Sequence, residues 1–161
     1  MKGILVLLFT VGILSLAAGC VMPEQQMVPP SPENETFAPA TIRIHFNDQE
    51  LIAELYDNPT AEDLASLLPL TLTFRDYSGT EKISYPPRDL NTTDVPAGHD
   101  PAAGDITLYA PWENIAIFYR DFSYSPGLVP IGHITSGLEH LSAVDGEFTA
   151  TIEAAIPQNM S

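Results

Sequence analysis

The sequence has 161 residues, a formal net charge of −15 at pH 7 and a hydrophobic content of 45%. This length predicts one domain that can bury a core without disulfides. So acidic a chain excludes nucleic acid and anionic lipid head groups as partners, because their phosphates repel it. We interpret the charge mainly as a source of solubility, with attraction of cationic peptides as the alternative.

The N-terminus is typical of an export signal. Lys2 is followed by the apolar run ILVLLFTVGILSL over residues 4–16 and then by small residues. The run is shorter than the roughly 20 apolar residues of a membrane-spanning helix. We therefore expect residues 1–19 to be a signal peptide that is removed on export.

Cys20, the single cysteine, follows directly after LAAG. A lone thiol cannot form an internal disulfide and needs another explanation in an exported chain. The segment resembles the lipobox of prokaryotic lipoproteins. That resemblance implies cleavage before Cys20 and a lipid on its sulfur, which would anchor the protein to the outer face of the cell membrane. Ordinary cleavage, giving a secreted protein with a free thiol, is the alternative.

The next segment differs in composition from the rest of the chain. Residues 20–40 contain five prolines and no basic residue, which predicts a stiff, extended tether. We place the folded domain at residues 41–157 and a short tail at residues 158–161.

The domain opens with alternating apolar and polar residues. TIRIHF at 41–46 and LIAELY at 51–56 predict two strands of a hairpin across NDQE. The segment NPTAEDLASLLP then predicts a short helix with Thr60 as its N-cap and Asp63 in its first turn, ended by Pro69.

The rest of the chain predicts mostly strands. A hairpin is expected over residues 70–77 and 78–85, and a loop over 86–104. Further strands are expected at 105–110, 114–122, 127–135 and 146–155, with a short helix at 136–143. About eight strands and two short helices, without a strand–helix–strand rhythm, predict a mainly β fold: a closed antiparallel barrel.

Two long segments carry a resemblance to a known family. They are DNPTAEDLASLLPLTLTFRDYSGTEKISYPPRDL at 57–90 and GDITLYAPWENIAIFYRDFSYSPGLVPIGHITSGLEHL at 104–141. Both closely resemble the small prokaryotic cyclophilin-like proteins, and the likeness extends over about residues 41–157. It implies an eight-stranded barrel capped by helices. PIGHITSGLEHLSAV also looks like the last strand and following helix of true cyclophilins.

True cyclophilins are peptidyl-prolyl isomerases, whose site combines an arginine, a glutamine and an NGSQFF-like strand beside an apolar pocket. The corresponding strand here, ENIAIFYRD, keeps Asn114 and Phe118 but lacks the Ser-Gln pair. The glutamines of this chain fall in the predicted tether, turn and tail. We therefore assign no catalytic residue, and weak isomerase activity on exported proteins is an alternative to simple binding.

The stretch YAPWENIAIFYRDFSY at 109–124 is rich in aromatic residues. Strand alternation places Ile115 and Ile117 on one face, and Phe118, Arg120 and Phe122 on the other. The guanidinium of Arg120 could stack on these two rings and donate to a peptide carbonyl. Pairing of Arg120 with a carboxylate at the barrel end is the alternative.

Two further residues are ligand-binding candidates. Trp112, in the PWEN turn, is either an exposed binding ring or a cap on the barrel. Arg88 opens the long loop and either contacts an anion or carbonyl group, or is simply solvated. The motif DVPAGHDPAAGD at 94–105 matches neither calcium nor zinc spacing, so we expect no metal and no cofactor.

Together these features predict an exported, lipid-anchored, cyclophilin-like barrel that binds a peptide or small ligand through Arg120, Phe118, Phe122, Trp112 and Arg88. Contact with the membrane is expected through the lipid alone. Besides weak isomerase activity, a structural role in the cell envelope is the other alternative.

Overall fold

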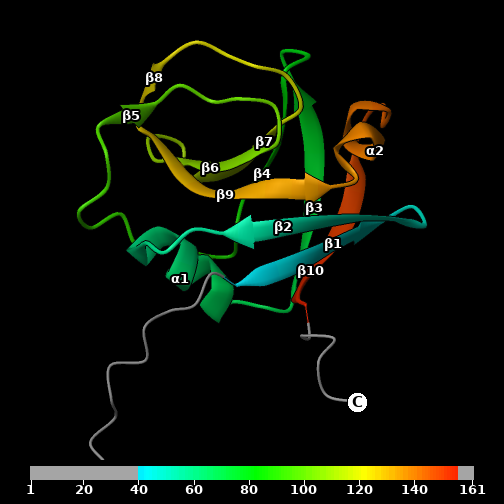
Figure 1. The fold of residues 1–161 in the computed structure, drawn as a ribbon, viewed down its shortest axis with the longest axis horizontal. Helices are drawn as coiled ribbons and strands as arrows, with labels where there is room; N and C mark the ends of the chain where they lie inside the picture. The colour runs from blue at the N-terminus through cyan, green and yellow to red at the C-terminus, as the bar shows by residue number, and fades with distance from the viewer. Residues whose placement is uncertain (1–39, 156–161) are drawn as a thin grey trace, which may run out of the picture. The chain divides into compact units, whose positions relative to one another are not determined.

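The computed structural model of this chain describes residues 40–155 (Figure 1). The predicted signal peptide, Cys20, nearly all of the tether and the tail lie outside the described residues. Of the helices in the described part, none combines the length and hydropathy needed to cross a bilayer.

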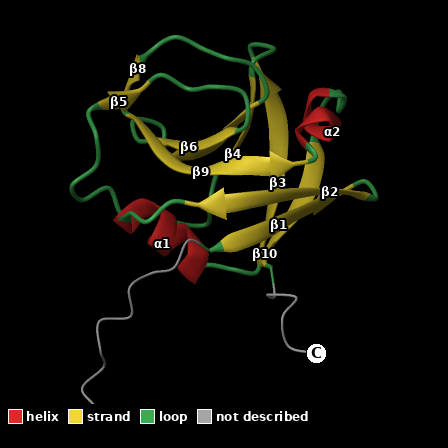
Figure 2. Ribbon diagram, in the orientation of Figure 1, coloured by secondary structure: helices red, strands yellow, loops and turns green. Residues whose placement is uncertain are grey.

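Within residues 40–155, eight strands close into an antiparallel barrel in the order β1-β10-β3-β4-β7-β6-β9-β2 (Figure 2). This confirms the predicted fold class. Short strands β5 and β8 pair separately, and two helices complete the domain. The bounds are β1 Thr41–Phe46, β2 Gln49–Leu55, α1 Pro59–Ser66, β3 Leu70–Tyr77, β4 Glu81–Ser84, β5 Gly98–His99, β6 Asp105–Tyr109, β7 Asn114–Phe118, β8 Ser125–Pro126, β9 Leu128–Ser136, α2 Leu138–Ser142 and β10 Phe148–Ala154.

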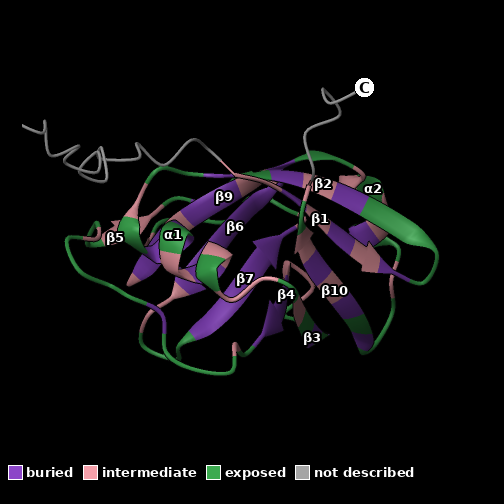
Figure 3. Ribbon diagram, turned by 90° about the horizontal axis from the view of Figure 1, so that it is seen from below, coloured by how far each residue is buried: buried purple, intermediate pink, exposed green. Residues whose placement is uncertain are grey.

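Alternation along the strands builds the core inside the barrel. In β10, Phe148, Ala150 and Ile152 are buried, while Thr149 is exposed and Thr151 half-buried. The ring of Phe148 lies 5.6 Å from that of Phe74 and 4.7 Å from that of Phe46, measured between centroids. The helices α1 and α2 lie on opposite sides of the barrel (Figures 1 and 3), and each adds apolar side chains to this core.

The first hairpin is tighter than predicted. Phe46 pairs directly with Gln49, so the turn contains two residues, Asn47 and Asp48, with φ of 46° and 60°. Asn and Asp tolerate this left-handed conformation better than most residues, and it suits the twist of a two-residue hairpin.

The prediction of Thr60 as N-cap of α1 is wrong. Asn58 is the cap: its Oδ1 accepts a hydrogen bond of 3.0 Å from the backbone N–H of Ala61, and Pro59 begins the helix with its φ already set. Thr60 is buried inside the helix, where its hydroxyl donates to the carbonyl of Asn91 at 2.6 Å. The side chain of Thr60 thus fixes the long loop to α1.

Strand β7 is shorter than predicted, because residues after Phe118 leave the barrel instead of continuing to Phe122. All five residues of β7 are buried (Figure 3). Ile115 and Ile117 pack in the main core, whereas Ala116 and Phe118 pack in a second cluster on the outer face of the sheet. The predicted division of faces is confirmed for residues 115–118 and does not extend to Arg120 and Phe122, which lie beyond the end of the strand. The outer cluster forms the base of a cavity.

Candidate functional site

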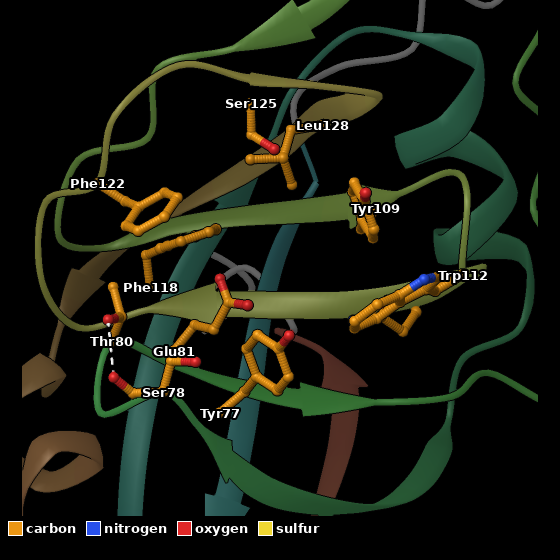
Figure 4. A pocket seen from close by; sticks show the side chains of 11 residues that line it. Tyr77, Ser78, Thr80, Glu81, Tyr109, Trp112, Phe118, Phe122, Ser125 and Leu128 are labelled. Atoms are coloured by element: carbon orange, nitrogen blue, oxygen red, sulfur yellow. Dashed lines mark hydrogen bonds between the residues drawn. The ribbon is translucent and has the colours of Figure 1, made fainter.

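A cavity of about 350 Å³ opens on the outer face of the barrel (Figure 4). Five aromatic side chains line it: Tyr77, Tyr109, Trp112, Phe118 and Phe122. The other lining residues include one carboxylic acid, Glu81, one amide, Asn114, and the hydroxyl groups of serine and threonine. Pockets of this size and apolar character are typical of sites for small ligands or single side chains.

The strand register brings the lining residues together. Tyr77 of β3 lies opposite Glu81 of β4, which lies opposite Phe118 of β7. Directly paired residues point to the same face of a sheet about 5 Å apart, so these three side chains form one row. A second row crosses β7, β6 and β9 through Asn114, Tyr109 and Leu128.

The aromatic side chains contact one another around the opening. Trp112 meets the rings of Tyr77 and Tyr109 edge to face, at centroid distances of 5.7 Å and 5.4 Å. Phe122 stacks on Phe118 at 6.4 Å. Trp112 and Phe122 remain about half exposed, at 48% and 50%. The walls are therefore apolar, packed against each other, and still reachable from solvent.

Glu81 supplies an unpaired acid to this apolar surface. Its side chain lies between Tyr77 and Phe118 (Figure 4). Within residues 40–155 we find no hydrogen bond or ion pair to its carboxyl group. Burial, and secondarily the negative charge of Asp76, raise the pKa of Glu81 to about 7. A carboxyl group with a pKa near neutrality in a cavity is a common property of functional sites.

Asn114 adds a second polar group. It is only 2% exposed, and its Nδ2 makes a long hydrogen bond of 3.5 Å to the carbonyl of Ile115. Its Oδ1 accepts no hydrogen bond from the described part of the chain. Most buried side-chain oxygens have a partner, so an unpartnered amide oxygen beside a cavity indicates an unused acceptor.

The segment that carries Phe122 is held in place by backbone hydrogen bonds to the long loop. The N–H of Phe122 donates to the carbonyl of Pro101, and the N–H of Gly127 donates to that of Ala97, both at 2.9 Å. Pairing of β5 with β8 joins the same two segments. The outer wall of the cavity is thus ordered by the loop at 86–104.

A buried carboxylate, Asp105, fixes that loop to the barrel. Its Oδ2 lies 2.8 Å from Nε2 of His99, and its Oδ1 lies 2.9 Å from Nδ1 of His133. Burial acts to raise the pKa of Asp105, but the hydrogen bonds from both histidines lower it overall. His99 and Asp105 both belong to the motif at 94–105. In residues 40–155, no three His, Cys, Asp or Glu side chains are arranged to hold a metal ion.

Of the residues selected from the sequence, the structure brings together Trp112, Phe118 and Phe122. Arg120 lies outside the lining: it is exposed, and its guanidinium carbon is 5.8 Å from the centroid of the Tyr119 ring. Phe118 and Phe122 stack on each other instead of on Arg120.

Arg88 also lies away from the cavity. It donates two hydrogen bonds, of 2.7 Å and 2.6 Å, to the carboxylate of Asp63 on α1. These hydrogen bonds lower the pKa of Asp63 to about 2. Arg88 therefore attaches the start of the long loop to the helix.

Sequence reasoning missed Tyr77, Glu81, Tyr109 and Asn114 as site residues. The local signal for Glu81 was weak, because an acidic residue at the start of a strand is usually solvated. Only the register of β4 with its two neighbours places this acid between aromatic rings.

The chain matches the Cyclophilin-like family over residues 44–153, well over half of its length. No curated protein matches it. Among solved structures, it is similar to the solution structure of the hypothetical protein AF2241 from Archaeoglobus fulgidus, with a TM-score of 0.61 and 21% sequence identity. The likeness covers 76% of this chain and 99% of the other, and it concerns the fold.

We predict that Glu81 makes the protein less stable as the pH rises from 4.5 to about 7. The folded state holds the Glu81 proton more tightly than the unfolded state, so ionisation in this range favours unfolding. Because Glu81 is half exposed, solvent reduces the effect to about 1 to 2 kcal/mol. Urea unfolding near pH 5 and near pH 8 should show Glu81→Gln gaining this much stability over the wild type at the higher pH.

The matched control for that experiment is Glu147→Gln, which removes the same charge from an exposed position outside the cavity. It should leave the pH dependence of the wild type unchanged. Equal loss of stability with pH in the wild type and in Glu81→Gln would contradict the prediction.

Proposed function

The chain belongs to the cyclophilin-like family, and we propose that its barrel is a binding module for a peptide or small ligand, held outside the cell by a lipid on Cys20. The observation that carries the binding role is the cavity on the outer face of the barrel. It combines about 350 Å³ of space, five aromatic side chains, the carboxyl group of Glu81 and the Oδ1 atom of Asn114; the last two lack partners in the described residues.

The contents of the cavity favour binding over isomerisation. A prolyl isomerase of the cyclophilin type uses an arginine and a glutamine to act on the prolyl amide. Among the described residues that line the cavity, none is an arginine or a glutamine, and Arg120 is directed to Tyr119. The aromatic walls and acceptors suffice to hold a ligand, because recognition needs shape, apolar contact and a few placed polar groups.

The location outside the cell is supported by the sequence. The basic residue Lys2, the apolar run at 4–16 and the small residues before Cys20 have the order expected of an export signal. The proline-rich tether would hold the domain away from the lipid. Together they suit a domain that captures ligands near the membrane surface.

We expect small-molecule fragments that bind this protein to do so at the cavity. In a two-dimensional NMR titration, shift changes should concentrate on the cavity rows of β3, β4, β6, β7 and β9. Phe122→Ala should weaken binding about threefold to tenfold, because it removes one ring of the wall. Tyr85→Ala, equally exposed but outside the cavity, is the control. Fragments that bind only elsewhere, or a screen without any binding fragment, would contradict the proposal.

We expect no acceleration of proline isomerisation. The assay compares the cis-to-trans rate of a chromogenic Ala-Pro peptide with and without the protein. A rate at the uncatalysed level supports a binding module. Catalysis well above background that is lost in Arg120→Ala or Arg88→Ala would instead establish an isomerase.

Substitution of the predicted lipid site should release the protein. We expect Cys20→Ser, expressed in a bacterium that processes lipoproteins, to move the protein from the membrane fraction to the soluble exported fraction. The physical reason is that the thioether to the lipid requires the sulfur of Cys20. Membrane association that is unchanged in Cys20→Ser would argue against lipidation.

A further inference from the structure

In residues 40–155, no basic side chain is paired with the carboxyl group of Glu81. Strand β3 brings Asp76 and Tyr77 near it, of which Asp76 is an acid. Lys82, next in β4, directs its Nζ to Asp76 at 2.9 Å and to the carbonyl of Val144 at 2.7 Å. Tyr119, after β7, donates its hydroxyl to Asp76 at 2.6 Å. Lys82 is thus already paired. Arg75 of β3 and Arg120 after β7 are exposed, and Arg120 lies over the ring of Tyr119. Neither arginine pairs with Glu81 in the described part of the chain.

The surroundings of Glu81 also favour positive charge. The faces of aromatic rings carry negative electrostatic potential and attract cations, most strongly when water is displaced. Five such rings line the cavity with Glu81, and none of the described lining residues is Lys, Arg or His. The net charge of −15 adds a long-range attraction for cations. The carboxylate of Glu81, the faces of the rings and the net charge of the chain therefore all favour a cation.

We propose that the cavity selects ligands that carry an ammonium or guanidinium group, with Glu81 as the counter-ion and the aromatic rings as walls. This inference rests on the proposed binding function and names the ligand chemistry for it. Glu81 has no cationic partner among the described residues, and the ammonium or guanidinium group of the ligand takes that role. Asn114 also lines the cavity, and its buried Oδ1 accepts no hydrogen bond in the described residues.

Binding of a cation at Glu81 depends on pH. The surrounding protein raises the pKa of Glu81 to about 7, so the acid is largely neutral near pH 5 and ionised near pH 8. Asp76 has a lowered pKa and stays charged in this range, whereas the pKa of Tyr119 is raised to about 12 and its hydroxyl stays neutral. A primary ammonium group remains charged throughout. Affinity for such a cation therefore increases as pH rises through 7.

Three probes with one ring and different head groups test the proposal: benzylammonium, benzyl alcohol and benzoate. Trp112 is the one tryptophan in the 161-residue sequence and lines the cavity, so its fluorescence reports occupancy. Near pH 8 we expect benzylammonium to bind about tenfold more tightly than benzyl alcohol, and benzoate more weakly than either. Near pH 5 the preference for benzylammonium over benzyl alcohol should largely disappear.

The variant Glu81→Gln should remove both the preference for benzylammonium over benzyl alcohol and the pH dependence of that preference. Glu147→Gln, with the same change in net charge, should behave as the wild type. This pair separates a local counter-ion from the general attraction of an acidic protein. The pH dependence measured on the wild type is an independent test that needs no variant.

The possible results test the cation selectivity separately from the binding function on which it rests. Equal binding of all three probes, or a cation preference that survives in Glu81→Gln, overturns the cation selectivity and leaves the binding module intact. No response of Trp112 to any probe, together with an unsuccessful fragment titration, overturns the binding function itself. A cation preference that depends on Glu81 and on pH supports both.

A second arm identifies the source of the cation. Nα-acetyl-lysine methylamide and Nα-acetyl-norleucine methylamide share the same blocked backbone, but only the lysine compound carries a side-chain ammonium group. Tighter binding of the lysine compound than of benzylammonium would indicate a basic peptide segment, and the reverse order would indicate a free amine. Equal affinity of the lysine and norleucine compounds would count against the proposal.

Discussion

The side chains of β7 are buried on both faces of the sheet, and the cavity depends on this packing. Ile115 and Ile117 fill the inside of the closed barrel, while Ala116 and Phe118 need a cover outside it. These outer side chains are removed from water only if another segment of the chain crosses the outer face of the sheet. Residues after Phe118 do so, and the space that they leave over the sheet is the cavity.

Glu81 illustrates how a site can act against stability. A half-buried acid without a partner lowers the stability of the folded state at neutral pH, and an apolar residue in the same row would pack better. The local fold tolerates it because the closed barrel and its large core supply the stabilisation. Acids whose pKa is raised by burial are concentrated at functional sites. Glu81 therefore indicates the position of a binding site better than the exposed Arg88 and Arg120 do.

The candidate site was only partly predictable. Phe118, Phe122 and Trp112 stand out because aromatic residues cluster in one stretch of chain. Glu81 and Tyr77 were missed, since they belong to a different hairpin and join the site only through pairing of β4 with β7. Arg120 was selected for its position between two phenylalanines, but the chain leaves the strand at Phe118 and the alternation that would have aligned them ends there.

The sequence by itself determined the strand pattern, the antiparallel barrel and the apolar faces of β7, because these follow from local alternation with a period of two residues. It also predicts an export signal in residues 1–19. Tertiary structure alone decided which side chains share the cavity, which acid is left without a partner and where each arginine pairs. Those properties depend on register between strands distant in the chain and on the loop that covers them, and local periodicity contains no information on either.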